Sequence, residues 1–255
     1  MRDCGTAATQ ADGEKTILAA VIPCLDEEEA IGPVVAAVLS QGVAEVVVVD
    51  GASTDRTADR AIAAGARVVV EPRRGYGRAI QAGIAALRKD VNIVVFLDGD
   101  GSDPVEFIPA LVAPIKAGKA AFVLGSRTRG SRQAQSLSPT QIAAGRVGGL
   151  LLRLVYGAHF SDLSPYRAIR RDALDRLGMR DISYGWNLEM LMRVAATGLP
   201  ATEIAVGQRR RVGGVSKVSG NRVASIRAGA VLAFTFVRLA FSLRRERRIS
   251  EPVNR

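Results

Sequence analysis

Residues Ile93-Val-Val-Phe-Leu-Asp-Gly-Asp-Gly-Ser-Asp-Pro104 decide the fold that we expect for this chain. The first five residues are apolar, and Asp98, Asp100 and Asp103 follow at once. An apolar run of this length predicts a buried strand, and the Gly-Ser-Asp-Pro sequence ends it. The strand would therefore deliver carboxylates to one edge of a sheet. Such a cluster is either solvated loop charge or a set of hard oxygen ligands for a divalent cation.

Strands and helices are predicted to alternate on both sides of this stretch. Alternation at intervals of about 25 residues favours right-handed βαβ units, and hence an α/β fold with a mixed, mainly parallel sheet. Apolar, β-branched runs place strands at 16–23, 44–50, 67–70, 93–97, 120–124 and 201–211, and residues 160–169 are predicted to be a loop that leads into a strand. Helical spacing places helices at 30–39, 56–64, 78–87, 104–116, 140–157, 171–177, 184–196 and 222–243.

Four loops should meet beyond the carboxyl ends of the parallel strands, where ligands of such sheets bind. They carry the acidic residues after Pro23, Asp50, an Arg-Gly loop at 73–77, and the Asp98/Asp100 pair. An Asp-x-Asp pair opposite a basic glycine loop suits a nucleoside diphosphate held through a divalent cation. The chain lacks the P-loop signature, which excludes a P-loop NTPase, and it lacks Gly-x-Gly-x-x-Gly after its first strand, which weakens a dinucleotide oxidoreductase.

Composition indicates a globular protein. The 255 residues are 48% hydrophobic, so the chain can bury a large core. Two cysteines are too few for a disulfide framework, which favours a reducing compartment. Residues 1–15 contain no apolar segment, so we expect a disordered lead-in and no signal peptide.

The positive charge is concentrated near the end of the chain. Of the net +10, all arises after residue 204, where 12 Lys/Arg stand against 2 Asp/Glu. This distribution argues against a nucleic-acid partner and for a basic surface that faces an acidic ligand or an anionic membrane. The predicted helix at 222–243 has an uninterrupted apolar run of only ten residues, 228–237, short of the roughly 20 that cross a bilayer. It can lie in a membrane interface, contact a partner subunit, or pack on the body.

Five motifs occur together along the chain. They are Val21-Ile22-Pro23 with Asp26-Glu27-Glu28, Val49-Asp50-Gly51-Ala52-Ser53-Thr54-Asp55, Arg74-Gly75-Tyr76-Gly77-Arg78-Ala79, Asp98-Gly99-Asp100 and Gly125-Ser126-Arg127. In this order and approximate spacing the chain resembles the family 2 glycosyltransferases, and the dolichol-phosphate mannosyltransferase-like branch in particular. The resemblance covers about residues 16–220. Residues 221–255 would then form an amphipathic helix and a basic tail.

This resemblance implies a GT-A fold and an inverting enzyme that uses a UDP- or GDP-sugar with Mg²⁺ or Mn²⁺. Asp100 would ligate the metal, with Asp98 in the ribose or metal shell, and Arg127 would face the sugar or phosphates. The residues implied at the nucleotide are Pro23, Asp26, Glu28, Asp50, Gly75, Arg78 and Asp98. Asp26 stands where the family more often has Asn, and Asp50-Gly51-Ala52-Ser53 replaces the usual Asp-Asp-Gly-Ser, so the base contact stays open. Asp26 could instead cap the helix that follows it.

The acceptor in this branch is usually a polyprenyl phosphate. Its phosphate oxygen is already ionised at pH 7, so no strong general base is required. The residues that would hold this phosphate, or close over the diphosphate, are Arg167, Arg209, Arg211 and Lys217. With a hydroxyl acceptor instead, Glu189 or Asp162 becomes the candidate base. Alternatively, Glu189 pairs with Arg193 four residues on, and Asp162 caps its loop.

The function that we expect is glycosyl transfer to a lipid-like acceptor, at the cytoplasmic face of the cell membrane. Homo-oligomers are compatible with the sequence. Two alternatives stay open. A sugar-phosphate nucleotidyltransferase of similar fold should have a Gly-rich sequence with Arg and Lys after the first strand, where this chain is acidic. A non-catalytic subunit could use the basic tail to bind a partner, but it would not need the aspartate pair.

Overall fold

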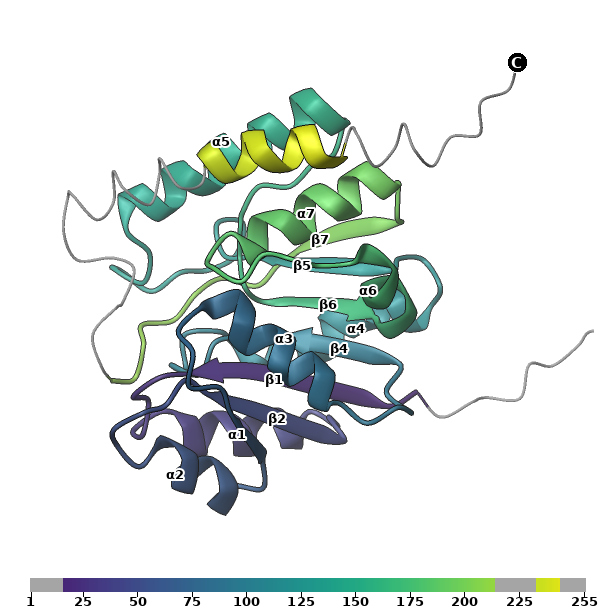
Figure 1. Ribbon diagram of the computed structural model, residues 1–255. Helices are drawn as coiled ribbons and strands as arrows, with labels where there is room; N and C mark the ends of the chain where they lie inside the picture. Colours follow the sequence, from purple (N-terminus) through teal and green to yellow (C-terminus); the bar gives the residue numbers. More distant parts are fainter. Residues whose placement is uncertain (1–15, 214–232, 244–255) are drawn as a thin grey trace, which may run out of the picture.

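The computed structural model describes residues 16–213 and 233–243 (Figure 1). All structural statements below refer to these two ranges. The predicted lead-in at 1–15, Lys217, and most of the predicted tail at 221–255 lie outside them.

The core of the protein is one seven-stranded sheet of order β3-β2-β1-β4-β6-β5-β7. Only β6 runs antiparallel to its neighbours, which confirms the predicted mixed, mainly parallel sheet. The strands are β1 Leu18–Cys24, β2 Glu45–Asp50, β3 Arg67–Val70, β4 Ile93–Phe96, β5 Phe122–Ser126, β6 Arg167–Arg170 and β7 Ala201–Ala205. The helices are α1 Ile31–Ser40, α2 Thr57–Ala63, α3 Tyr76–Ala86, η1 Val105–Phe107, α4 Ile108–Lys116, α5 Pro139–Tyr156, α6 Arg171–Leu177 and α7 Trp186–Thr197.

Helices cover both faces of the sheet, because the strands are apolar on both sides. Alternate residues of β1 show this directly. Ala19 and Val21 join the core beneath α3, α5, α6 and α7, whereas Ala20 and Ile22 join the core beneath α1, α2 and α4 (Figure 1). The four parallel strands β1 to β4 therefore end at the same edge, where the predicted site residues lie.

The last strand is shorter than predicted. β7 ends at Ala205, whereas the sequence pattern suggested a strand to Arg211. Gly207 has φ 79°, and a Cβ at this position would lie 1.8 Å from the Ser131 carbonyl oxygen, so the chain turns away from the sheet here. Residues 208–212 then cross the edge of the sheet at which the parallel strands β1 to β4 end, which we call the carboxyl edge. The amide of Arg209 donates to Ser102 O (2.9 Å), and that of Val212 donates to Asp100 O (2.9 Å).

The described part of the terminal helix, 233–243, packs on the body. Phe236, Leu239 and Leu243 are buried in the core that α5 and α7 share. The Arg238 guanidinium pairs with Asp181 (Nη2 to Oδ2, 2.9 Å). Of the three alternatives for this helix, packing on the body is confirmed for these residues. None of the helices in the two described ranges is long and apolar enough to span a bilayer.

Candidate active site

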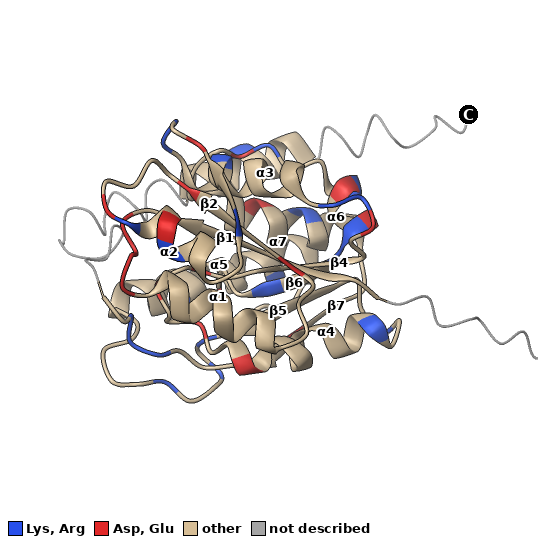
Figure 2. Ribbon diagram, turned by 90° about the horizontal axis from the view of Figure 1, so that it is seen from below, with Lys and Arg blue, Asp and Glu red and all other residues tan. Residues whose placement is uncertain are grey.

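Three carboxylates lie together after β4, at the edge of the sheet where acidic loop segments gather beside α2 (Figure 2). Asp103 accepts from the Asp98 amide (2.9 Å), and Asp100 accepts from the Ser102 amide (2.9 Å). Asp103 Oδ1 is buried with no hydrogen-bond partner among the described residues. Burial and repulsion within the cluster raise the pKa of Asp98 well above its usual value and that of Asp103 to about 7. The cluster therefore favours the arrival of positive charge.

A positive group already lies on this cluster. The Arg211 guanidinium is 2.7 Å (Nη2) and 3.2 Å (Nε) from Asp100 Oδ2, and its Nη2 is 3.3 Å from Glu27 Oε1. Its Nη1 is buried without a hydrogen-bond partner in the described part of the chain. The turn at Gly207 is what brings Arg211 here. The sequence predicted Arg211 near the diphosphate, but its contact with Asp100 was not foreseen.

The carboxylate oxygens of this cluster are suitable ligands for Mg²⁺ or Mn²⁺. Both cations prefer hard oxygen ligands, which Asp98 and Asp100 offer, and the orphaned Asp103 oxygen adds acceptor capacity nearby. The described residues contain no group of three or more His, Cys, Asp or Glu side chains with ligand geometry. Mg²⁺ is commonly held by one or two carboxylates together with substrate phosphates and water. The cluster is therefore suited to a cation that binds together with a diphosphate.

The loops after β1 and β2 are joined by side-chain hydrogen bonds. Asp26, at φ 51°, accepts from the Thr54 amide (2.8 Å), and its own amide donates to Ser53 Oγ (2.9 Å). Asp50 is buried and accepts from the Ser53 amide (3.2 Å). The alternative that Asp26 caps the next helix is wrong, since the N-cap of α1 is Ala30. Asp26 instead fixes one loop on the other, so both can present a single surface to a ligand.

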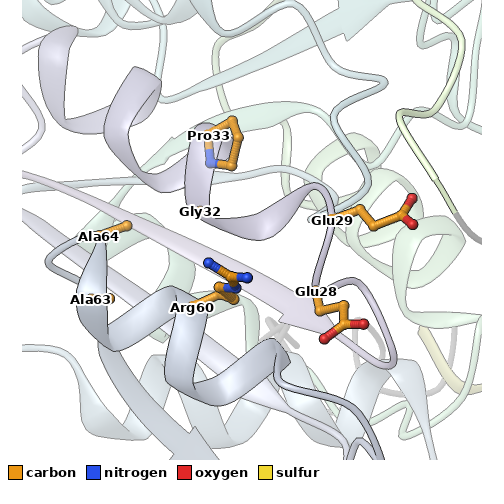
Figure 3. A pocket seen from close by; sticks show the side chains of 7 residues that line it. All are labelled: Glu28, Glu29, Gly32, Pro33, Arg60, Ala63 and Ala64. Atoms are coloured by element: carbon orange, nitrogen blue, oxygen red, sulfur yellow. The ribbon is translucent and has the colours of Figure 1, made fainter.

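Glu28 lines an open hollow of about 500 Å³ between the start of α1 and the second half of α2 (Figure 3). The Glu28 carboxylate accepts from the amide (3.1 Å) and Nε (3.4 Å) of Arg56. Seven residues line the hollow: Glu28, Glu29, Gly32, Pro33, Arg60, Ala63 and Ala64. The carboxylates after β4 are not among them, so the hollow is not the centre of the site. Pro23, also predicted at the nucleoside, is half-buried at the end of β1.

The Arg-Gly loop packs tightly against residues 181–183. A Cβ on Gly75 (φ 145°) would lie 2.4 Å from Ile182 O, and one on Gly77 would lie 2.2 Å from Asp181 O. The amides of Gly77 and Arg78 donate to Ser183 O (3.1 Å) and Ile182 O (3.2 Å). These two amides of the first turn of α3 are therefore engaged by protein carbonyls. Arg78 is half-buried, and its Nε is buried without a hydrogen-bond partner among the described residues.

Gly77→Ala tests this packing. We expect the free energy of unfolding to fall by about 1–3 kcal/mol, because the new methyl group meets backbone that cannot move aside cheaply. Gly32→Ala is the matched control, since its Cβ would meet nothing closer than 3.8 Å and alanine favours the interior of α1. Urea denaturation measures both. Equal stability of Gly77→Ala and the wild type would show that the 181–183 loop does not pack on α3 in this way.

Arg127 and Asp162 form a bidentate ion pair. Arg127 Nη2 and Nε lie 2.8 and 2.9 Å from the two oxygens of the buried Asp162 carboxylate, which also accepts from the amides of Arg127 and Leu163. Burial alone would lower the pKa of Arg127, but the hydrogen bond and charge of Asp162, together with the charges of Asp103 and Asp98, raise it. Asp162 thus accepts from four donors. The alternative that it caps its loop is confirmed, and its carboxylate orients Arg127 as well.

Glu189 is fully buried at the start of α7. It accepts from Arg193 Nε (2.8 Å) and from the amides of Arg180 (3.0 Å) and Asp181 (2.7 Å). The predicted alternative, a pair with Arg193 at i+4, is confirmed. Glu189 also holds the segment whose carbonyls engage the Arg-Gly loop, which sequence reasoning missed. The glycine spacing at 75 and 77 was the only signal, because it can mark close backbone packing as well as a phosphate loop.

The predicted phosphate-binding arginines lie in different environments. Arg167 is fully buried and donates to the carbonyls of Asn187 (3.1 Å), Pro165 (3.3 Å) and Ser164, and burial lowers its pKa to about 10. No surface of Arg167 is open to a phosphate in this arrangement. Arg209 pairs with Glu106 at the surface. Of the three predicted arginines, only Arg211 contacts the carboxylate cluster.

Comparisons with known proteins place the chain among glycosyltransferases. The glycosyl transferase family 2 model matches residues 19–178. An uncharacterized glycosyltransferase of Mycobacterium tuberculosis is 42% identical over 210 residues, which are 81% of this chain and 91% of that protein. A dolichyl-phosphate hexose transferase of Haloferax volcanii is 36% identical over 201 residues, 77% of this chain and 84% of the relative.

Solved structures agree on the fold. Glucosyl-3-phosphoglycerate synthase of Mycobacterium tuberculosis, solved in complex with Mn²⁺, UDP and glucosyl-3-phosphoglycerate, superimposes with a TM-score of 0.70. The match has 24% sequence identity and covers 89% of this chain and 80% of that one. The family match, the relatives and the shared GT-A fold together show that the chain belongs to glycosyltransferase family 2.

Proposed function

We propose that this glycosyltransferase moves a sugar, with inversion, from a nucleoside diphosphate sugar to a lipid phosphate. The observation that carries the proposal is the cluster of Asp98, Asp100 and Asp103 at the carboxyl edge, with Arg211 lying on it. The Mn²⁺ and UDP bound by glucosyl-3-phosphoglycerate synthase support the donor class and a divalent cation. The name of the Haloferax relative supports the lipid-phosphate acceptor. Family membership sets aside a nucleotidyltransferase and a non-catalytic subunit.

Each group at the edge has a distinct part in this proposal. Asp100 and Asp98 would hold Mg²⁺ or Mn²⁺, which when bound neutralises charge on the diphosphate leaving group. Arg127 is a fixed positive group, because Asp162 orients it through two hydrogen bonds. Arg211 lies on Asp100, and its Nη1 has no hydrogen-bond partner among the described residues, so this guanidinium would meet a diphosphate that binds at the cluster. Asp26 and Asp50 would shape the nucleoside side of the site, with Pro23, Glu28, Gly75 and Arg78 around it.

The burial and hydrogen bonding of the two candidate bases, Glu189 and Asp162, favour a phosphate acceptor over a hydroxyl acceptor. Glu189 and Asp162 are both fully buried and accept hydrogen bonds from backbone amides and an arginine. Both carboxylates are enclosed and already engaged by these donors, so neither is placed within reach of an acceptor hydroxyl in this arrangement. A lipid phosphate needs no general base, since its attacking oxygen is already ionised at pH 7. An enzyme with this acceptor would work at a membrane surface, and we place it at the cytoplasmic face.

Calorimetric titration with UDP-sugars and GDP-sugars tests the donor half of the proposal. We expect one nucleotide to bind in the micromolar range with Mn²⁺ present and at least about tenfold more weakly after chelation, because an acidic cluster and a diphosphate need a cation between them. ADP-glucose serves as a control for nonspecific nucleotide binding. Binding that is unchanged by chelation would contradict the metal-dependent site.

A further inference from the structure

An apolar surface extends over two helices on the α5 side of the molecule. Along α5, Val147, Leu150 and Leu154 recur at helical spacing, as Phe234, Val237 and Phe241 do along 233–243. Exposed fractions are 57% for Val147, 55% for Leu150, 72% for Leu154, 69% for Phe234, 53% for Val237 and 67% for Phe241. The outward stripe of a surface helix is normally polar. Here both outward stripes are apolar, and we call them together the two-helix face.

The two helices lie side by side and are held firmly on the body (Figure 1). A groove of about 110 Å³ between them is lined by Val155 of α5 and by Phe236, Val237, Ala240 and Phe241. On the inner side of α5, a Cβ on Gly149 would lie 2.1 Å from Phe160 O, so this helix sits too close to the body to rotate. The terminal helix is anchored by Leu239 and Leu243. The exposed side chains therefore cannot turn inward together.

The charge of the two-helix face distinguishes between two possible binding partners, a second copy of this chain and an anionic membrane. Arg146 and Arg153 are exposed among the apolar residues of α5, whereas Arg238 on the second helix is already paired with Asp181. Neither 139–156 nor 233–243 contains an aspartate or glutamate. A second copy of the chain docked symmetrically would place arginine against arginine, which is unfavourable. Anionic headgroups complement these arginines, while the leucines and phenylalanines can enter the interface below them.

We propose that the two-helix face seats the protein on a membrane that contains anionic lipids. The terminal helix alone was expected from the sequence to approach a membrane, whereas α5 supplies half of this surface. The inference rests on the proposed function in one respect, because it names the surface that brings the enzyme to its lipid acceptor. α5 follows directly from the loop that carries Arg127 and Ser138, so docking here would hold one wall of the site near the membrane.

Flotation of the full chain with vesicles tests the proposal. We expect the wild type to float with phosphatidylcholine vesicles containing phosphatidylglycerol, and Leu150→Gln/Leu154→Gln to bind them at least about tenfold more weakly, since two apolar contacts are lost. Ile62→Gln on α2 is the matched control, because Ile62 is equally exposed (59%) but lies across the sheet. Arg146→Gln/Arg153→Gln should lose roughly tenfold only on the anionic vesicles. Lys119→Gln controls for the change in charge.

Two results would overturn the proposal. One is flotation of Leu150→Gln/Leu154→Gln equal to that of the wild type. The other is a wild-type dimer in sedimentation that does not float and that this variant abolishes, which would assign the face to a second copy. Nucleotide binding by the same variant and by the wild type, measured by calorimetry with Mn²⁺, separates failure of the membrane-binding proposal from failure of the proposed function. Retained nucleotide binding by the variant together with its lost flotation supports the face. Flotation of the wild type without any nucleotide binding by the wild type would leave the face standing and contradict the proposed function.

Discussion

Asp100→Asn is expected to lower the rate of sugar transfer by about 10³-fold, which corresponds to several kcal/mol of lost transition-state stabilisation. Asn keeps the size of the side chain and its acceptor for the Ser102 amide (2.9 Å). What disappears is the negative oxygen that lies 2.7 Å from Arg211 and is the predicted metal ligand. Initial rates at saturating Mn²⁺, with the donor identified by calorimetry, measure the effect.

A matched control separates this effect from a general loss of acidity. Asp175 is an exposed aspartate on α6 that pairs with Arg171, far from the carboxyl edge in sequence and topology. Asp175→Asn should keep the wild-type rate. If Asp100→Asn also keeps a rate within threefold of the wild type, the carboxylate cluster is not the catalytic centre.

Glu189→Ala is expected to reduce the free energy of unfolding by about 3–5 kcal/mol, the usual cost of removing one partner from a buried ion pair. The change takes the carboxylate away from buried Arg193 and from the amides of Arg180 and Asp181. Urea denaturation followed by circular dichroism gives the value. Glu106→Ala is the control, because Glu106 pairs with Arg209 at the surface, where such pairs contribute about 1 kcal/mol or less.

The same variant also tests the catalytic alternative for Glu189. A general base would leave stability near that of the wild type while the rate falls by about 10²-fold or more. Glu189→Gln refines the distinction, since glutamine can still accept from one amide and should recover part of the lost stability. Wild-type stability of Glu189→Ala together with an inactive enzyme would restore Glu189 as a base.

The sequence predicted the fold well where hydrophobic pattern is decisive. The run from Val46 to Val49 lies buried on both faces of the sheet, as β-branched continuity indicates. The convergence of the loops after β1, β2 and β4 followed from parallel connections alone. The direction of each strand could not be predicted in this way, because a strand of only four residues, such as β6, carries no sequence signal for its orientation. The end of β7 was wrong because the turn at Gly207 depends on the neighbouring Ser131 loop.

Charged residues were harder to assign than the fold. A charge in a sequence shows no partner, so Arg167 was predicted to hold a phosphate although its partners are buried carbonyls. Asp162 and Glu189 are similar cases, since both the catalytic and the structural interpretations require a carboxylate in the same place. The predicted role of Gly75 at the nucleotide remains a prediction, because close packing on Ile182 already accounts for the glycine.

The most direct test is transfer of labelled sugar from the preferred nucleotide-sugar donor to a polyprenyl phosphate in the presence of Mn²⁺, with the matching dephosphorylated polyprenol as the comparison. The proposed function predicts a glycosylated lipid phosphate whose anomeric configuration is opposite to that of the donor, and no product from the polyprenol. Equal transfer to the polyprenol, or product with the donor's own configuration, would contradict it.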